Sequence, residues 1–252
     1  MTQAEFREAV LRGDVLAGTF MKTPSVDILE VLILSGLDFV CFDAEHAPFD
    51  RGALNACAAV ACAAGFPFVI RVPVGTPSEI GMALDTGASG VVVPHVTDAQ
   101  TAARIAKAGR FGHGGRGYAG STRWAGFGTS DMPTLLSRSQ TETLVIAQIE
   151  DPEGVDNCEA IAATPGVDAI FLGPADLSVA YGKTDQSSAE LKAAQARVGA
   201  AARAEGKGCM TFTATAAASK PLMDHGYHVF FVASEHAWIL QGARALMSDL
   251  KG

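Results

Sequence analysis

The segment LVIAQIEDPEGVDNCEAIAATPGVDAIFLGPAD, residues 144–176, contains two short apolar runs that are separated by a more polar stretch. The runs cover residues 144–150 and 169–173, and both faces of each run are largely apolar, which is typical of strands buried in a parallel sheet. Runs of the same kind recur at 15–20, 38–43, 67–71, 90–94, 208–213 and 229–233. The pattern therefore predicts eight buried strands.

Alanine-rich stretches that favour helices lie between the predicted strands, for example at 54–64, 77–86 and 189–205. Regular alternation of strand and helix implies parallel strands joined by right-handed crossovers. Eight such units match a closed (β/α)8 barrel of the TIM type, and we expect residues 1–252 to form it as one α/β domain. The side chains expected to cap helix N-termini are Ser25, Asp50, Thr76 and Asp98.

The composition excludes several classes of function. Of 252 residues, 48% are hydrophobic and 18% are charged, and the formal net charge of −8 disfavours nonspecific nucleic-acid binding. No apolar run is long enough for a membrane span, and the first residues, MTQAEFREAVLRGD, lack the apolar centre of a signal peptide. The five cysteines form no CxxC pair. We therefore expect a cytoplasmic protein with reduced thiols that binds neither nucleic acid nor membranes.

Polar side chains gather where the predicted strands end. The active sites of such barrels lie at the C-terminal ends of the strands. Charged groups buried there are costly unless they are paired or bound to something, so their concentration predicts a site. The residues concerned are Asp43, Glu45, His46, Arg71, His95, Gln148, Glu150 and Asp176.

Glu150 and Asp176 follow two consecutive predicted strands, which lie ~4.8 Å apart in a sheet. Both carboxylates could reach one hard divalent cation such as Mg²⁺ or Mn²⁺, with water and substrate oxygens as the other ligands. The alternative is that both are N-terminal carboxylates of the helices that follow. The spacing alone leaves both interpretations open.

Three further side chains have a catalytic and a structural interpretation each. His46 is a candidate general base, because imidazole titrates near neutral pH, or else a surface-loop histidine. Asp85 could orient His46 if the fold brings them together, and is otherwise a solvated carboxylate at a helix end. Arg71 could stabilise a developing oxyanion, pair with Asp43 or Glu45, or do both.

The glycine-rich segment 110–131 is the longest irregular stretch. It has no nucleotide-binding motif, and we expect a mobile flap over the site, with Arg116, Arg123 and Trp124 as substrate or subunit contacts. Gly173-Pro174-Ala175 precedes a predicted helix and offers backbone N–H groups to a carboxylate. Among the lysines, only Lys22 lies just beyond the end of a predicted strand, and a Schiff-base mechanism is disfavoured because it sits in a loop.

Taken together, these motifs resemble the HpcH/HpaI family of metal-dependent pyruvate aldolases. The matching pieces occur in order over most of the chain, and those containing EHAP and GPADLS are specific in combination. They are Asp43–Pro48, Val69–Pro73, Val92–Pro94, Arg116-Gly117, Gln148–Glu150 and Phe171–Ser178. The segment around Tyr118 and Trp124 departs from the dicarboxylate-cleaving members of that family, which leaves the aldehyde partner open.

The resemblance implies a class II aldolase that reversibly cleaves 4-hydroxy-2-oxo acids into pyruvate and an aldehyde. Mg²⁺, Mn²⁺ or Co²⁺ is the implied cofactor, and the implied assembly is a homohexamer of dimers that exchange C-terminal helices, here residues 235–250. The alternatives are a CoA-thioester lyase, as in citrate-lyase-like relatives, and a noncatalytic barrel. The implied roles are metal ligands for Glu150 and Asp176, base for His46, activation of that base for Asp85, transition-state stabilisation for Arg71, and substrate binding for Gln148, Gly173, Ala175 and Asp176.

Overall fold

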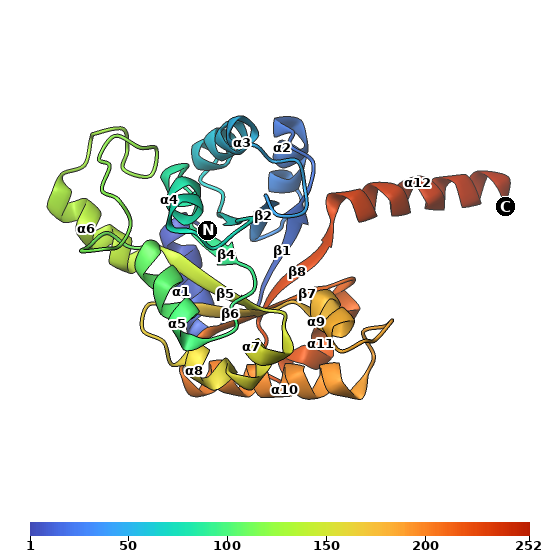
Figure 1. Cartoon of the computed structure of the whole chain (residues 1–252). Coiled ribbons are helices and arrows are strands. Elements are labelled where there is room, and N and C mark those ends of the chain that lie inside the picture. The colour runs from blue at the N-terminus through green and yellow to red at the C-terminus, as the bar shows by residue number, and fades with distance from the viewer.

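The computed structural model describes residues 1–252 and confirms the predicted barrel. Eight parallel strands close in the order β1 to β8, and β8 pairs with β1 through Val229 and Leu16 (Figure 1). The predicted strand boundaries hold to within one residue. The strands are β1 (Leu16–Met21), β2 (Phe39–Asp43), β3 (Phe68–Arg71), β4 (Gly90–Val93), β5 (Leu144–Ile149), β6 (Ala169–Leu172), β7 (Gly208–Thr213) and β8 (Val229–Ser234).

Helices surround the barrel, and at least one helix follows every strand. Ser25, Asp50, Thr76 and Asp98 are N-caps as predicted, each accepting a hydrogen bond from the backbone N–H three residues later. The helices are α1 (Gln3–Arg12), α2 (Val26–Leu34), α3 (Arg51–Ala63), α4 (Pro77–Asp85), α5 (Ala99–Ala108), α6 (Met132–Thr141), α7 (Pro152–Asp156), α8 (Cys158–Ala162), α9 (Pro174–Ala180), α10 (Ala189–Ala204), α11 (Ala216–Met223) and α12 (Glu235–Lys251).

The apolar core forms two layers because side chains alternate along each strand. The outer layer lies between the strands and the helices. The inner layer fills the barrel and includes Phe39, Phe171 and Phe231, together with Phe6 and Val10 of α1. Helix α1 therefore packs against the apolar filling of the barrel, and the polar residues collect at the C-terminal ends of the strands.

The glycine-rich segment 110–131 does not cover the barrel mouth, so the expected flap is wrong. The segment lies beside α6 (Figure 1). Its residues Phe111 and Trp124 form a small buried cluster with Leu135 of α6. The guanidinium of Arg116 lies 4.8 Å from the Phe111 ring and 4.9 Å from the Trp124 ring. Trp124 is buried, and no residue of the segment lines the pocket at the mouth. Aromatic burial thus holds the segment against its own subunit.

Helix α12 projects away from the barrel (Figure 1). It spans the predicted C-terminal helix, and among its residues only Glu235, at its start, is buried. Its large exposed apolar residues are Ile239, Leu240, Leu246, Met247 and Leu250. No helix of the structure combines the length and the apolar character that a membrane crossing requires.

Candidate active site

The alternation of side chains carries polar groups into the barrel mouth. Phe39 and Cys41 belong to the inner layer, and Asp43 is the next residue of β2 with the same orientation. Val69 is followed in the same way by Arg71 on β3. On β5, Leu144 and Ile146 are followed by Gln148 and then by Glu150, just beyond the strand end. The inward-facing rows therefore change from apolar to polar at their C-terminal ends.

Asp43 and Arg71 form a buried bidentate ion pair. Arg71 Nε donates to Asp43 Oδ1 at 3.0 Å, and Nη2 donates to Oδ2 at 2.9 Å. Burial alone would raise the pKa of Asp43, but the hydrogen bonds and the charge of Arg71 hold that pKa below its ordinary value. These contacts leave Nη1 of Arg71 free to donate to a ligand in the pocket.

Glu45 and His46 follow Asp43 in the loop after β2. Glu45 Oε2 lies 3.2 Å from Arg71 Nε, and burial raises the pKa of Glu45 despite that charge. Arg71 thus pairs with both Asp43 and Glu45, as the structural interpretation predicted. The backbone N–H of His46 donates to Asp43 Oδ1 at 3.1 Å, and its half-exposed side chain lines the pocket.

Asp85 lies elsewhere. Asp85 is the last residue of α4, and its carboxylate accepts a hydrogen bond from Arg116 Nη2. The charged partner of His46 is instead Glu45, whose Oε2 is 3.8 Å from Nε2. Within one chain, the structure therefore does not bring Asp85 and His46 together, and no contact between these two side chains supports the predicted pairing.

Glu150 is a buried carboxylate without a lysine or arginine partner. It is 2% exposed. The amide of Gln148 donates to its Oε2, the backbone N–H of His95 donates to its Oε1 at 3.0 Å, and Nδ1 of the exposed His95 ring lies 3.5 Å from that same Oε1. A Cβ at Gly173 would lie 2.9 Å from Oε2, so glycine leaves the room that this carboxylate needs. Gln148 Oε1 is buried and has no hydrogen-bond partner.

These observations fit a divalent cation. An ionised carboxylate in a buried position is costly unless a positive charge is close, and an unpartnered amide oxygen is a suitable additional neighbour. Ligand atoms of Glu45, His95 and Glu150 lie within 4.8 Å of one another. The spacing of the sequence did not point to Glu45 or His95 as neighbours of Glu150, because the three residues follow different strands and only the closed barrel brings them together.

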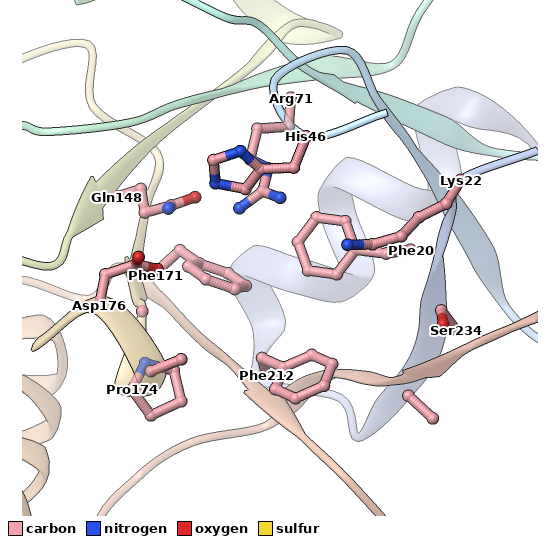
Figure 2. A pocket seen from close by; sticks show the side chains of 13 residues that line it. Phe20, Lys22, His46, Arg71, Gln148, Phe171, Pro174, Asp176, Phe212 and Ser234 are labelled. Carbon is pink, nitrogen blue, oxygen red and sulfur yellow. The ribbon is translucent and has the colours of Figure 1, made fainter. Parts of the chain in front are cut away.

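A pocket of about 230 Å³ opens at the barrel mouth. Figure 2 shows His46 and Arg71 on one side of it, with Gln148 and Asp176 close by. Asp176 is exposed in the first turn of α9, and no side chain caps that helix. Two of the predicted site residues lie outside the lining: Glu150, which contacts Gln148, and Asp85, which contacts Arg116. The predicted residues that line the pocket are His46, Arg71, Gln148, Gly173, Ala175 and Asp176.

Sequence reasoning missed part of this lining. Phe20, Phe212 and Lys22 all face the pocket, and Lys22 Nζ lies 3.5 Å from Asp43 Oδ2. The alternation along β1 was the available signal, because Leu16 and Phe20 belong to the inner layer and Lys22 has the same orientation.

Comparisons with known proteins agree with this architecture. A family model described as HpcH/HpaI aldolase/citrate lyase matches residues 16–239. A hydroxypyruvate/pyruvate aldolase of Paraburkholderia phytofirmans is 32% identical over 246 residues, covering 94% of this chain and 94% of that protein. A 5-keto-4-deoxy-D-glucarate aldolase of Salmonella arizonae is 34% identical over 250 residues, covering 98% of this chain and 96% of that protein.

A solved structure is also closely similar. The crystal structure of an HpcH/HpaI aldolase/citrate lyase family protein from Burkholderia cenocepacia J2315 superposes with a TM-score of 0.92 at 32% identity, covering 99% of this chain and 100% of that one. The extent of the family match and the shared barrel lead to one conclusion. The chain belongs to the HpcH/HpaI aldolase/citrate lyase family.

Proposed function

We propose that the protein is a metal-dependent aldolase that reversibly cleaves 4-hydroxy-2-oxo acids into pyruvate and an aldehyde. The observation that carries this proposal is the buried carboxylate of Glu150, which has no lysine or arginine partner and lies directly behind a pocket lined by His46, Arg71 and Asp176. The volume of about 230 Å³ is below the ~300–1,000 Å³ of sites for drug-sized ligands, and it suits a small oxo acid.

Glu150 and Asp176 would hold the cation, as carboxylates at the ends of consecutive β/α units. Such an ion supplies Lewis-acid polarisation of a carbonyl oxygen. Mg²⁺, Mn²⁺ and Co²⁺ all suit oxygen-rich surroundings. The uncapped start of α9 offers the N–H group of Ala175 to the carboxylate of the oxo acid, whereas Pro174 has none to give.

Arg71 and His46 carry the remaining steps. His46 accepts the proton of the C4 hydroxyl group, and the C3–C4 bond breaks to release the aldehyde. The electron pair of that bond passes into the enolate of pyruvate, whose negative charge Arg71 stabilises through Nη1. Protonation at C3 completes pyruvate. The reverse sequence is an aldol addition.

The exposed apolar residues of α12 support an assembly of several copies. Ile239, Leu240 and Leu246 are exposed, and no other element of the chain covers them. An apolar stripe of this kind is stable in water when it packs against another subunit. We propose the homohexamer of helix-exchanging dimers that the resemblance implies.

Enolisation of pyruvate tests the proposed function without any aldehyde. In D₂O containing Mn²⁺ or Mg²⁺, the protein is expected to exchange the methyl protons of pyruvate, because forming the enolate is the half-reaction that cleavage and addition share. Proton NMR after removal of the metal follows the loss of the methyl signal. An exchange rate equal to that of the metal-containing buffer would contradict the proposal.

A further inference from the structure

Lys22 begins the loop after β1, and its backbone is fixed from the opposite end of the chain. The N–H groups of Lys22 and Thr23 donate to Oε1 of Glu235 at 2.8 and 2.6 Å. Glu235 is 3% exposed and starts α12, directly after β8. These hydrogen bonds therefore fix the backbone position from which the Lys22 side chain extends into the pocket.

The ammonium group of Lys22 has donors to spare. Its one charged neighbour is Asp43 Oδ2, at 3.5 Å, and it makes no hydrogen bond to the protein. Asp43 already accepts from both Nε and Nη2 of Arg71 and from the backbone of His46. Since Asp43 is satisfied without it, and since the side chain is one-third exposed within the pocket, the ammonium group is available to a ligand.

The two ends of the pocket differ in character. Figure 2 shows Lys22 entering opposite Gln148 and Asp176, with the rings of Phe20 and Phe171 between them. Under the proposed function, the 2-oxo acid end of the substrate binds beside Gln148 and Asp176. The end derived from the aldehyde then points across the apolar rings toward Lys22.

We propose that Lys22 is a specificity-determining residue that binds a carboxylate on the aldehyde, so that the preferred aldehyde is a short aldehydic acid. This inference rests on the proposed function. An ammonium group and a carboxylate form a charge-assisted hydrogen bond, which a neutral aldehyde of the same size cannot make.

Lys22 is poorly suited to be a Schiff-base nucleophile. Such lysines are desolvated in apolar pockets or placed next to another cationic group, which lowers the pKa of the amine. Lys22 instead lies beside the carboxylate of Asp43 and is partly open to water. Its position favours binding an anion over attacking a carbonyl group.

Matched aldehydes test this role. Aldol addition of pyruvate is measured with glyoxylate, which carries a carboxylate, and with glycolaldehyde, which is neutral and of similar size. Lys22→Met keeps the length of the side chain and removes its charge. We expect the ratio of kcat/KM for glyoxylate to that for glycolaldehyde to fall roughly 10- to 100-fold, mainly through KM for glyoxylate, as for the loss of one hydrogen bond to a charged group.

Two control variants make the result specific. Lys22→Arg keeps the positive charge and is expected to retain most of the kcat/KM preference for glyoxylate. Lys107→Met removes a lysine from α5, outside the pocket, and is expected to leave this preference unchanged. Equal losses for both aldehydes in Lys22→Met would overturn the inference while wild-type exchange of pyruvate protons still supports the proposed function. Wild-type protein that neither exchanges those protons nor adds either aldehyde would overturn both.

Discussion

Glu150→Gln is expected to abolish aldol cleavage and leave the fold intact. The substitution removes one negative charge and keeps the shape of the side chain, so the attraction for a divalent cation is lost. Lewis-acid stabilisation of a developing charge amounts to several kcal/mol, and the expected fall in kcat is therefore roughly 10³-fold or more. Steady-state kinetics with a 4-hydroxy-2-oxo acid and saturating Mn²⁺ measure it.

The stability of the same variant distinguishes a functional carboxylate from a structural one. Glu150 is buried without a lysine or arginine partner, so a neutral amide removes a cost of desolvation. In the presence of a chelator, Glu150→Gln should melt at a temperature at least as high as the wild type. The control is Glu153→Gln, an exposed carboxylate in α7, which should change neither activity nor stability. An inactive Glu150→Gln protein that is also unfolded would contradict this account.

Asp43→Ala is expected to lower the free energy of unfolding by about 3–5 kcal/mol. The substitution leaves the guanidinium of Arg71, which is 6% exposed, without its bidentate partner. Chemical denaturation at neutral pH measures the loss. The matched control is Asp14→Ala, which removes a solvent-exposed ion pair with Arg12 and should leave the free energy of unfolding nearly unchanged.

The pH dependence of that difference has a definite sign. Burial raises the pKa of Asp43, but the hydrogen bonds and charge of Arg71 outweigh it and lower that pKa in the folded protein. The stabilisation from the ion pair is therefore fully present above the ordinary carboxyl pKa of about 3.9. It is lost as the pH falls through the lowered pKa of the folded state. The gap in stability between wild type and Asp43→Ala should therefore narrow in acid. A gap that widened below about pH 4 would show that Arg71 does not hold the charge of Asp43.

The fold was predictable because its strands repeat one simple pattern. Each β-strand is short, apolar on both faces and followed by a helix, and eight such units match a closed parallel barrel better than an open sheet. Ser25 and Thr76 show how local the helix signals are, since the capping hydrogen bond of each side chain is made within its own helix. Helix α1 went unpredicted, because its role is to pack Phe6 and Val10 against the barrel filling, a tertiary contact.

The candidate site was predictable only in part. Arg71 and Gln148 could be placed at the mouth from strand ends, since alternation fixes their orientation. Lys22 has the same orientation as the inward residues of β1, but it lies one residue beyond the strand end, where the alternation of a strand no longer predicts the direction of a side chain.

The behaviour of Arg116 could not be predicted from spacing. Its burial between Phe111 and Trp124, and its contact with Asp85, depend on how a long irregular segment folds back on itself. The glycines suggested mobility, whereas the aromatic side chains decide the packing. For the same reason, the predicted link between Asp85 and His46 has no contact in this chain.

Cation binding tests the central claim most directly. Calorimetric titration with Mn²⁺ should show binding to the wild type that becomes tighter when pyruvate is present, because the oxo acid adds ligands beside Glu150 and Asp176. Glu150→Gln and Asp176→Asn should each lose this pyruvate-dependent binding. Mn²⁺ binding that is unaffected by pyruvate, or unchanged in both variants, would contradict the account.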